Sequence, residues 1–84
     1  MSYSLDWYEE AVNSAAKYIV DDPAGLDDLF AVLDRLTDQP RPRRSKPLAT
    51  PNLRRLGVGR YRALYEIVEP VGSIIVIHLG RVGS

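Results

Sequence analysis

The stretch LRRLGVGRYRALYEI, residues 53–67, decides the fold of this 84-residue chain. Its two glycines predict a turn between one strand at about 52–56 and a second strand at about 61–68. Successive side chains of a strand point to opposite faces, and the face that consists of Tyr61, Ala63, Tyr65 and Ile67 is apolar enough to pack on a core. Arg62 and Glu66 then lie on the open face, where a ligand can approach.

Two helices are predicted upstream of this hairpin. Asp6 stands three residues before Glu9, which is typical of a capping box at the start of a helix. The apolar face predicted for this first helix consists of Trp7, Ala11, Ala15 and Ile19, with Tyr8 and Val12 beside it. Pro23 follows Asp22 and begins a second helix, whose apolar stripe consists of Leu26, Leu29, Phe30, Leu33 and Leu36. The short joint between the two helices predicts an antiparallel hairpin.

The remaining segments complete the predicted order of elements. Residues Met1–Leu5 predict a short first strand, and residues 73–78 predict a last strand after a turn that contains proline and glycine. Between the helices and the hairpin, the prolines of residues 37–51 argue against regular pairing and predict an exposed basic loop. The order β-α-α-β-β-β predicts an α+β fold in which a helical hairpin packs on one face of an antiparallel sheet. We expect one domain that spans residues 1–84.

The composition excludes several classes of protein. The chain contains no cysteine, so it has neither a disulfide framework nor a thiolate metal site. Its single histidine, His78, argues against a zinc site built from histidines. No apolar run approaches the roughly 18 to 20 residues that span a membrane, and no export signal opens the sequence. We therefore expect a cytoplasmic protein with no metal ion, no small-molecule cofactor and no membrane contact.

The charges are divided between the two halves of the chain, although the net charge is zero. Residues 1–40 contain nine acids and two bases, a balance of −7, and residues 41–84 contain nine bases and two acids, a balance of +7. Eight of these nine bases are arginine, whose forked guanidinium matches the geometry of phosphate. Either the folded chain has a cationic side that attracts polyanions, or the two halves neutralise each other.

Three segments resemble the RelE/ParE toxin family, namely LTDQPRP at 36–42, the stretch at 53–67 and IIVIHLGRVGS at 74–84. The family shares the order of a strand, a helical hairpin, a basic loop and an antiparallel meander. The resemblance implies a bacterial toxin of a type II toxin–antitoxin system, with a cognate antitoxin protein as its partner. RelE-type members cut mRNA in the ribosomal decoding site, where the 2′-hydroxyl attacks the adjacent phosphate. The ribosome and mRNA are therefore implied partners as well.

The resemblance also implies which residues form the catalytic site. Arg62 matches the family's arginine in the central strand, Arg55 a basic position in the preceding strand, and Arg81 a basic residue after the last strand. A guanidinium can hold two oxygens of a five-coordinate phosphorus through parallel hydrogen bonds. RNA contacts are expected from further basic residues, namely Arg43, Arg44, Lys46, Arg54 and Arg60. The alternative for the basic run at 41–46 is an exposed loop without such a role.

His78 is the candidate for proton transfer, because histidine is the side chain best suited to acid–base chemistry near neutral pH. It alternates with Ile74 and Val76, so the alternative is a hydrogen-bonded residue at the edge of the core. Arg55 and Arg62 have an alternative role as well. They can form a solvated ionic network on the sheet with Glu66 or Glu69.

Three functions are consistent with the sequence. The first is a ribosome-dependent endoribonuclease, an mRNA interferase that inhibits translation. The second is a ParE-like poison of DNA gyrase without chemistry of its own, which the short segment after the last strand favours. The third is a degenerate member that still binds its antitoxin and is no longer toxic.

Overall fold

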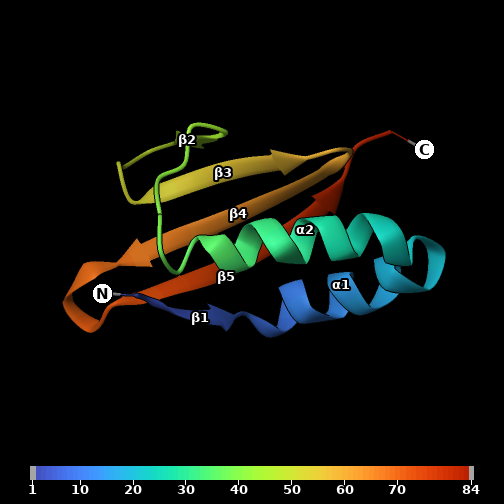
Figure 1. The fold of residues 1–84 in the computed structure, drawn as a ribbon, viewed down its shortest axis with the longest axis horizontal. Helices are drawn as coiled ribbons and strands as arrows, with labels where there is room; N and C mark the ends of the chain where they lie inside the picture. Colours follow the sequence, from blue (N-terminus) through green and yellow to red (C-terminus); the bar gives the residue numbers. More distant parts are fainter. Residues whose placement is uncertain (1, 84) are drawn as a thin grey trace.

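Five strands form one sheet in the computed structural model, which describes residues 2–83. The strand order is β1-β5-β4-β3-β2, so β4 lies at the centre (Figure 1). β1 pairs with β5 in parallel, and the other three pairs are antiparallel. The strand bounds are Ser4–Trp7 for β1, Ser45–Pro47 for β2, Leu53–Val58 for β3, Tyr61–Val68 for β4 and Ser73–Arg81 for β5, and a short 3-10 helix, η1, occupies Glu69–Val71.

Helices α1, Glu9–Asp21, and α2, Pro23–Arg35, form a hairpin that packs on one face of the sheet (Figure 1). α2 begins where predicted, because the Asp22 carboxylate accepts a hydrogen bond of 3.1 Å from the Gly25 amide at its first turn. The predicted α+β fold, with a helical hairpin on one face of a mostly antiparallel sheet, is confirmed. Neither of these two helices is long and apolar enough to cross a membrane.

The core lies between the helical hairpin and the sheet. The four residues predicted to face it from β4 are all buried, namely Tyr61, Ala63, Tyr65 and Ile67. They belong to one cluster with the buried leucines of the second helical stripe, namely Leu26, Leu29, Leu33 and Leu36. Because side chains alternate along a strand, burial of this set leaves Arg62, Leu64 and Glu66 on the open face.

The start of α1 differs from the prediction. The helix begins at Glu9 with Tyr8 as its N-cap, and this cap makes no side-chain hydrogen bond. The predicted capping box is therefore wrong. Asp6 lies in β1 instead, where its carboxylate accepts a hydrogen bond from the Ser73 hydroxyl on the paired strand β5. Pairing with β5 keeps the chain extended as far as Trp7, two residues beyond the predicted end of this strand at Leu5. The predicted start of the strand, Met1, lies outside the described residues.

The predicted apolar face of α1 is correct only in part. Trp7 packs against the core from β1 rather than from the helix, with its ring centroid 6.0 Å from that of Phe30. Ala11 and Ala15 are buried, and Tyr18 rather than Ile19 continues their row one turn later. The residues predicted beside this face are exposed, namely Tyr8 and Val12.

The proline-rich segment contains a strand that the sequence did not predict. Ser45–Pro47 forms β2 and pairs with β3, which places Lys46 directly opposite Arg55. Pro47 is tolerated because β2 is an edge strand of the sheet. On its outer side no neighbouring strand needs the N–H group that proline lacks. The expectation that residues 37–51 form only a loop is therefore wrong, and one of their basic residues lies on the sheet.

β5 runs to Arg81, beyond the predicted end, and contains a bulge. In its pairing with β4, Ile77 is the extra residue between Val76 and His78. One extra residue shifts the alternation of side chains, so His78 no longer shares the core side of Val76. His78 is exposed and Leu79 is buried.

Candidate functional site

The open face of the sheet presents two neighbouring rows of paired residues. One row crosses four strands through Lys46, Arg55, Leu64 and His78. The next row consists of Gly57, Arg62 and Gly80. Paired residues point to the same side of a sheet, so both rows lie on the surface opposite the helices. Arg62 thus has a glycine beside it on each neighbouring strand, which leaves open space around its side chain.

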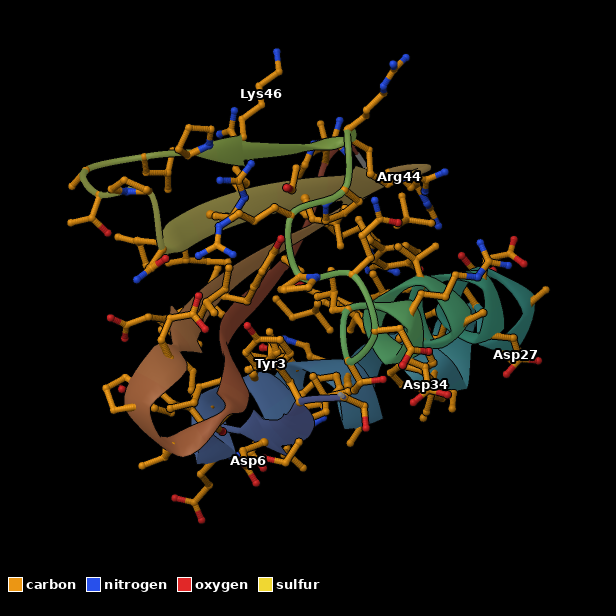
Figure 2. All side chains as sticks on the ribbon, turned by 60° about the vertical axis from the view of Figure 1, so that its left-hand side comes forward. Tyr3, Asp6, Asp27, Asp34, Arg44 and Lys46 are labelled. Carbon is orange, nitrogen blue, oxygen red and sulfur yellow. The ribbon has the colours of Figure 1, made fainter. Side chains whose placement is uncertain are left out.

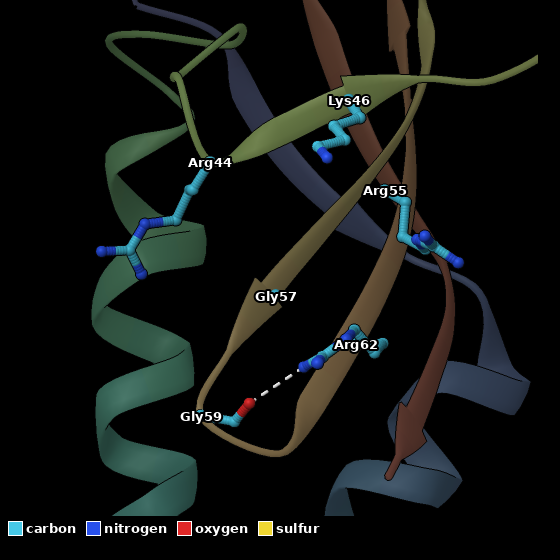
Figure 3. Close-up of a pocket in the computed structure, with 6 residues that line it drawn as sticks. All are labelled: Arg44, Lys46, Arg55, Gly57, Gly59 and Arg62. Atoms are coloured by element: carbon cyan, nitrogen blue, oxygen red, sulfur yellow. Dashed lines mark hydrogen bonds between the residues drawn. The ribbon is translucent and has the colours of Figure 1, made fainter.

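A hollow of about 300 Å³ opens on this surface (Figure 3). We call it the basic hollow, and it is lined by Arg44, Lys46, Arg55, Gly57, Gly59 and Arg62. Four of these lining residues are cations and the other two are glycines, so none of them is acidic or apolar. A concave surface of this composition suits an anion with several oxygens, such as phosphate.

The Arg62 guanidinium rests against the turn between β3 and β4. Its Nη1 donates hydrogen bonds to the carbonyl oxygens of Gly59, at 2.9 Å, and Tyr61, at 2.8 Å, the first of which is drawn in Figure 3. A Cβ atom at residue 57 would lie 3.2 Å from Nη1, so Gly57 makes room for this arrangement. Within residues 2–83, Nε and Nη2 donate to no protein group. These two nitrogens can therefore bind a ligand.

One of the two acids expected to neutralise this surface binds elsewhere. Glu69 pairs with Arg41 at 3.2 Å and accepts a hydrogen bond of 2.6 Å from the Tyr3 hydroxyl. The Tyr3 hydrogen bond, followed by that of Arg41, lowers the pKa of the Glu69 carboxyl. In the described part of the chain, neither Arg55 nor Arg62 forms an ion pair. The alternative, an ionic network of these arginines with Glu66 or Glu69, is thus not formed among the described residues.

Two predicted site residues lie away from the basic hollow. Arg81 turns toward α1, where its Cζ lies 4.7 Å from the centroid of the Tyr18 ring and its Nη2 lies 3.4 Å from the Asp21 carboxylate. Arg60 lies 3.9 Å from the Asp22 carboxylate at the start of α2. The two halves of the chain therefore neutralise each other in part, and the structure brings neither arginine to the open face.

Two further predicted RNA-binding residues have different surroundings. Arg54 holds β2 in place, since its Nε donates to the Ser45 hydroxyl at 2.9 Å and its Nη1 to the Pro51 carbonyl at 3.0 Å. Arg43 is exposed in the loop before β2, next to Arg44, which lines the basic hollow. Neighbouring basic residues thus differ in what they contact, which charge alone does not indicate.

His78 lies on the open face but does not line the basic hollow. Its Nδ1 is 2.9 Å from a carboxylate oxygen of Glu10, in the first turn of α1. The sequence did not single out Glu10 or Gly80, because both reach this surface only through the pairing of β5 with β4 and the packing of α1. Gly57 was predicted only as a turn residue, and its contact with Arg62 depends on strand register.

The remaining charges are separated in space. Figure 2 shows Arg44 and Lys46 on the side of β2, and Asp27 and Asp34 on the helical side. These two aspartates are exposed on α2. The predicted cationic side is therefore present, and the field of such a surface raises the local concentration of polyanions.

Residues 6–83 match the model of a protein family described as the ParE toxin of the type II toxin–antitoxin system parDE. The chain belongs to this family. It is a type II toxin of the RelE/ParE superfamily, as the sequence resemblance predicted. No curated protein sequence matches this toxin.

Solved structures of related toxins share the fold. The archaeal RelE–RelB complex from Pyrococcus horikoshii OT3 superposes with a TM-score of 0.84 at 22% identity, covering 99% of this toxin and 98% of that chain. A mutant of the E. coli toxin RelE in the free state gives a TM-score of 0.81 at 23% identity, with coverage of 96% and 84%. The chromosomal ParDE system from P. aeruginosa gives 0.73 at 17% identity, with 98% of both chains covered. At these identities, the comparison establishes the fold.

Proposed function

We propose that this toxin is a ribosome-dependent endoribonuclease that cleaves mRNA and thereby inhibits translation. The observation that carries the proposal is the basic hollow, where four cationic side chains converge and no lining residue is acidic. Cleavage of RNA requires stabilisation of the negative charge that develops on the phosphate oxygens in the transition state. Preorganised donors that point at those oxygens supply this stabilisation.

The proposed reaction is a transfer within the RNA backbone. The 2′-hydroxyl loses its proton, and its oxygen forms a bond to the adjacent phosphorus. The bond between this phosphorus and the 5′-oxygen of the next nucleotide breaks, and that oxygen takes up a proton. The products are a 2′,3′-cyclic phosphate and a free 5′-hydroxyl. The resemblance to RelE-type toxins implies this chemistry, and the protein has to provide charge stabilisation and alignment.

Arg62 is the residue that we assign to the phosphate oxygens. Its Nη1 is held by two carbonyl oxygens of the β3–β4 turn, so the guanidinium is already oriented before RNA binds. Its Nε and Nη2 can then donate to two phosphate oxygens in the forked geometry of arginine–phosphate pairs. Loss of one preorganised donor of this kind typically lowers the rate by about 100-fold to 1000-fold.

The other basic residues of the surface extend the contact along the RNA. Lys46 and Arg55 face each other on β2 and β3, so their charges act on the same phosphate or on its neighbour. Arg43 and Arg44 lie on the adjoining loop, where they can bind the flanking backbone. Contacts of this kind set the position of the RNA and carry no sequence information.

We also propose that a cognate antitoxin covers the basic hollow. The similar solved structures include complexes of RelE with RelB from Pyrococcus horikoshii and from E. coli. The cationic surface of this toxin is complementary to an acidic segment of a partner protein. Occupation of the basic hollow by such a segment excludes RNA and keeps the toxin silent.

The alternative function is poisoning of DNA gyrase without chemistry by the toxin. The family match described as ParE and the similarity to the P. aeruginosa ParDE system favour it. Under this alternative, expression produces DNA breaks and leaves mRNA intact. The cationic surface then serves to bind a macromolecule rather than to stabilise a phosphorane.

The test is tightly controlled expression in a bacterial host, with mRNA 5′ ends mapped by primer extension. We compare the wild type with Arg62→Ala and with Arg35→Ala, an exposed arginine in the last turn of α2. The proposal predicts growth arrest and new codon-phased cuts for the wild type and Arg35→Ala, and neither for Arg62→Ala. Arrest with DNA breaks and no cuts overturns the proposal in favour of gyrase. Harmless wild-type expression leaves the degenerate, antitoxin-binding function.

A further inference from the structure

The bulge in β5 turns the single histidine of the toxin toward the face that carries Arg62. Ile77 is the extra residue of the bulge, and the register resumes with His78 opposite Leu64. His78 therefore stands in the row that continues Lys46 and Arg55 across the sheet. If the same sequence paired without a bulge, Ile77 would face Leu64 and the imidazole of His78 would point to the helical side, as Val76 does.

Glu10 sets the orientation of the imidazole. Its carboxylate oxygen lies 2.9 Å from Nδ1 of His78, which joins the first turn of α1 to the edge of the sheet. A carboxylate can only accept, so Nδ1 carries the hydrogen of this bond. In the neutral imidazole the lone pair is then on Nε2. This is the arrangement in which an acid orients a histidine base in hydrolytic enzymes.

The free nitrogen points toward Gly80, beside Arg62. A Cβ atom at residue 80 would lie 3.5 Å from Nε2 of His78, so this nitrogen lies above the glycine. Gly80 is paired with Arg62, whose guanidinium turns the other way, over Gly57. The space above Gly80 therefore lies between the imidazole and the arginine backbone, and no side chain of residue 80 fills it. The charged groups that the surrounding elements bring to His78 are Glu10 from α1 and, diagonally, Arg62 and Glu66 from β4.

We infer that His78 is the general base of the cleavage and that Glu10 is its positioning residue. This inference rests on the proposed ribonuclease function. Nε2 takes the proton of the 2′-hydroxyl while the 2′-oxygen bonds to phosphorus, and Arg62 holds the phosphate oxygens. The bond to the 5′-oxygen breaks, and that oxygen is protonated from solvent. The imidazolium returns its proton to solvent, so the toxin is regenerated.

The first experiment measures single-turnover cleavage of an mRNA with a defined codon in the ribosomal A site, as a function of pH. His78→Gln is expected to lower the rate by about 100-fold or more, the usual contribution of a general base. It is also expected to abolish the fall in rate toward acid that protonation of the base produces. Glu10→Gln keeps the base and loses the carboxylate, so its cleavage rate should lie between those of the wild type and His78→Gln. Its rate should still fall as the pH is lowered. Glu9→Gln, an exposed glutamate in the same turn, is the matched control and should cleave like the wild type.

A steric variant and a chemical rescue separate a catalytic role from a structural one. Gly80→Ala places a methyl group in ordinary contact with Nε2, so it should preserve the melting temperature and reduce cleavage. Added imidazole should restore part of the cleavage by His78→Gly. If Arg62→Ala abolishes cleavage while His78→Gln cleaves at the wild-type rate with an unchanged pH profile, the inference about His78 is overturned and the ribonuclease function stands. If the wild type itself cleaves no mRNA, both are overturned.

Discussion

Gly57 on β3 and Arg62 on β4 form a facing pair in which the guanidinium lies over the glycine. A Cβ atom at residue 57 would lie 3.2 Å from Nη1 and 3.3 Å from Cζ of this guanidinium. Any larger side chain therefore forces the guanidinium to shift by at least a few tenths of an ångström relative to the turn carbonyls that hold it. The glycine determines where the charge of Arg62 rests, and through it the shape of the basic hollow.

Gly57→Ala should impair cleavage without unfolding the toxin. The methyl group pushes the guanidinium away by a few tenths of an ångström. Because a misplacement of about 1 Å in a catalytic group typically costs on the order of 100-fold in rate, the loss expected here is smaller than 100-fold. Alanine restricts the unfolded chain, so we expect the free energy of unfolding to change by no more than about 1 kcal/mol. The measurements are primer extension on ribosome-bound mRNA and urea unfolding.

A double-mutant comparison tests whether Gly57 acts through Arg62. In the Arg62→Ala background, Gly57→Ala should have no further effect on the cleavage rate, because the displaced group is already gone. An additional loss of the same size in that background would show that the glycine serves some other purpose.

The affinity of the basic hollow for RNA should fall with salt concentration, and more steeply the more of its cationic side chains contact phosphates. Each phosphate contact with single-stranded RNA contributes about −0.7 to the slope of log affinity against log salt concentration. Lys46→Ala should therefore reduce the magnitude of this slope by about 0.7. The measurement is fluorescence anisotropy with a short RNA that carries 2′-O-methyl groups and cannot be cut. Lys17→Ala removes an exposed lysine from α1 and should leave the slope unchanged; an equal effect of both variants would contradict the assignment.

The Asp22 carboxylate should make the toxin sensitive to acid. The Tyr61 hydroxyl donates to it at 2.7 Å and is the largest cause of the lowered pKa of Asp22, followed by the Gly25 amide. A carboxyl whose pKa is lower in the folded state stabilises the fold above its unfolded pKa, and this contribution is lost as the pH falls through the folded value. Asparagine removes the charge and keeps one acceptor oxygen, which can bind the Gly25 amide, while its amide nitrogen can donate to the Tyr61 hydroxyl oxygen.

Asp22→Asn should therefore lose less stability than the wild type when the pH is lowered from about 6 to about 3. The measurement is the urea midpoint at each pH. Asp27→Asn removes an exposed carboxylate from the same helix and should behave like the wild type. Equal acid sensitivity of Asp22→Asn and the wild type would disprove the role of this carboxylate.

Tyr65 should anchor the basic loop to the sheet. Its ring is fully buried, and its hydroxyl donates a hydrogen bond of 2.7 Å to the Pro40 carbonyl at the start of the loop. Tyr65→Phe removes this bond and should lower the free energy of unfolding by about 1 kcal/mol. Hydrogen exchange in residues 41–46 should become faster. Tyr8→Phe, at an exposed position, is the control and should change neither quantity.

The elements with strong local signals were predictable from the sequence. The start of α2 follows from Asp22 and Pro23, and the burial of one face of β4 follows from the apolar residues at every second position, 61, 63, 65 and 67. Such signals depend on residues within one turn or two strand positions of each other. The presence of a cationic surface was predictable as well, because nine of the eleven bases lie in the second half of the chain.

Which of the basic residues line the basic hollow was not predictable from the sequence. Arg54 and Arg55 are adjacent in the sequence, yet one binds the Ser45 hydroxyl and the other lines the basic hollow. Their different roles follow from the pairing of β3 with β2 and β4, which alternates the sides that they face. Arg81 was expected at the site and lies against Tyr18 on α1 instead. Such pairings join residues that are far apart in the chain.

The sequence by itself determined the α+β class, the face of β4 that is buried and the accumulation of arginine in the second half. The tertiary structure alone decided that Lys46 joins the sheet, that Gly57 and Gly80 flank Arg62, and that the bulge at Ile77 turns His78 toward the open face. The physical reason is that periodicity and capping arise between neighbouring residues, whereas strand register is set by the packing free energy of distant segments. A shift of one residue in that register exchanges every side chain between the core and the site.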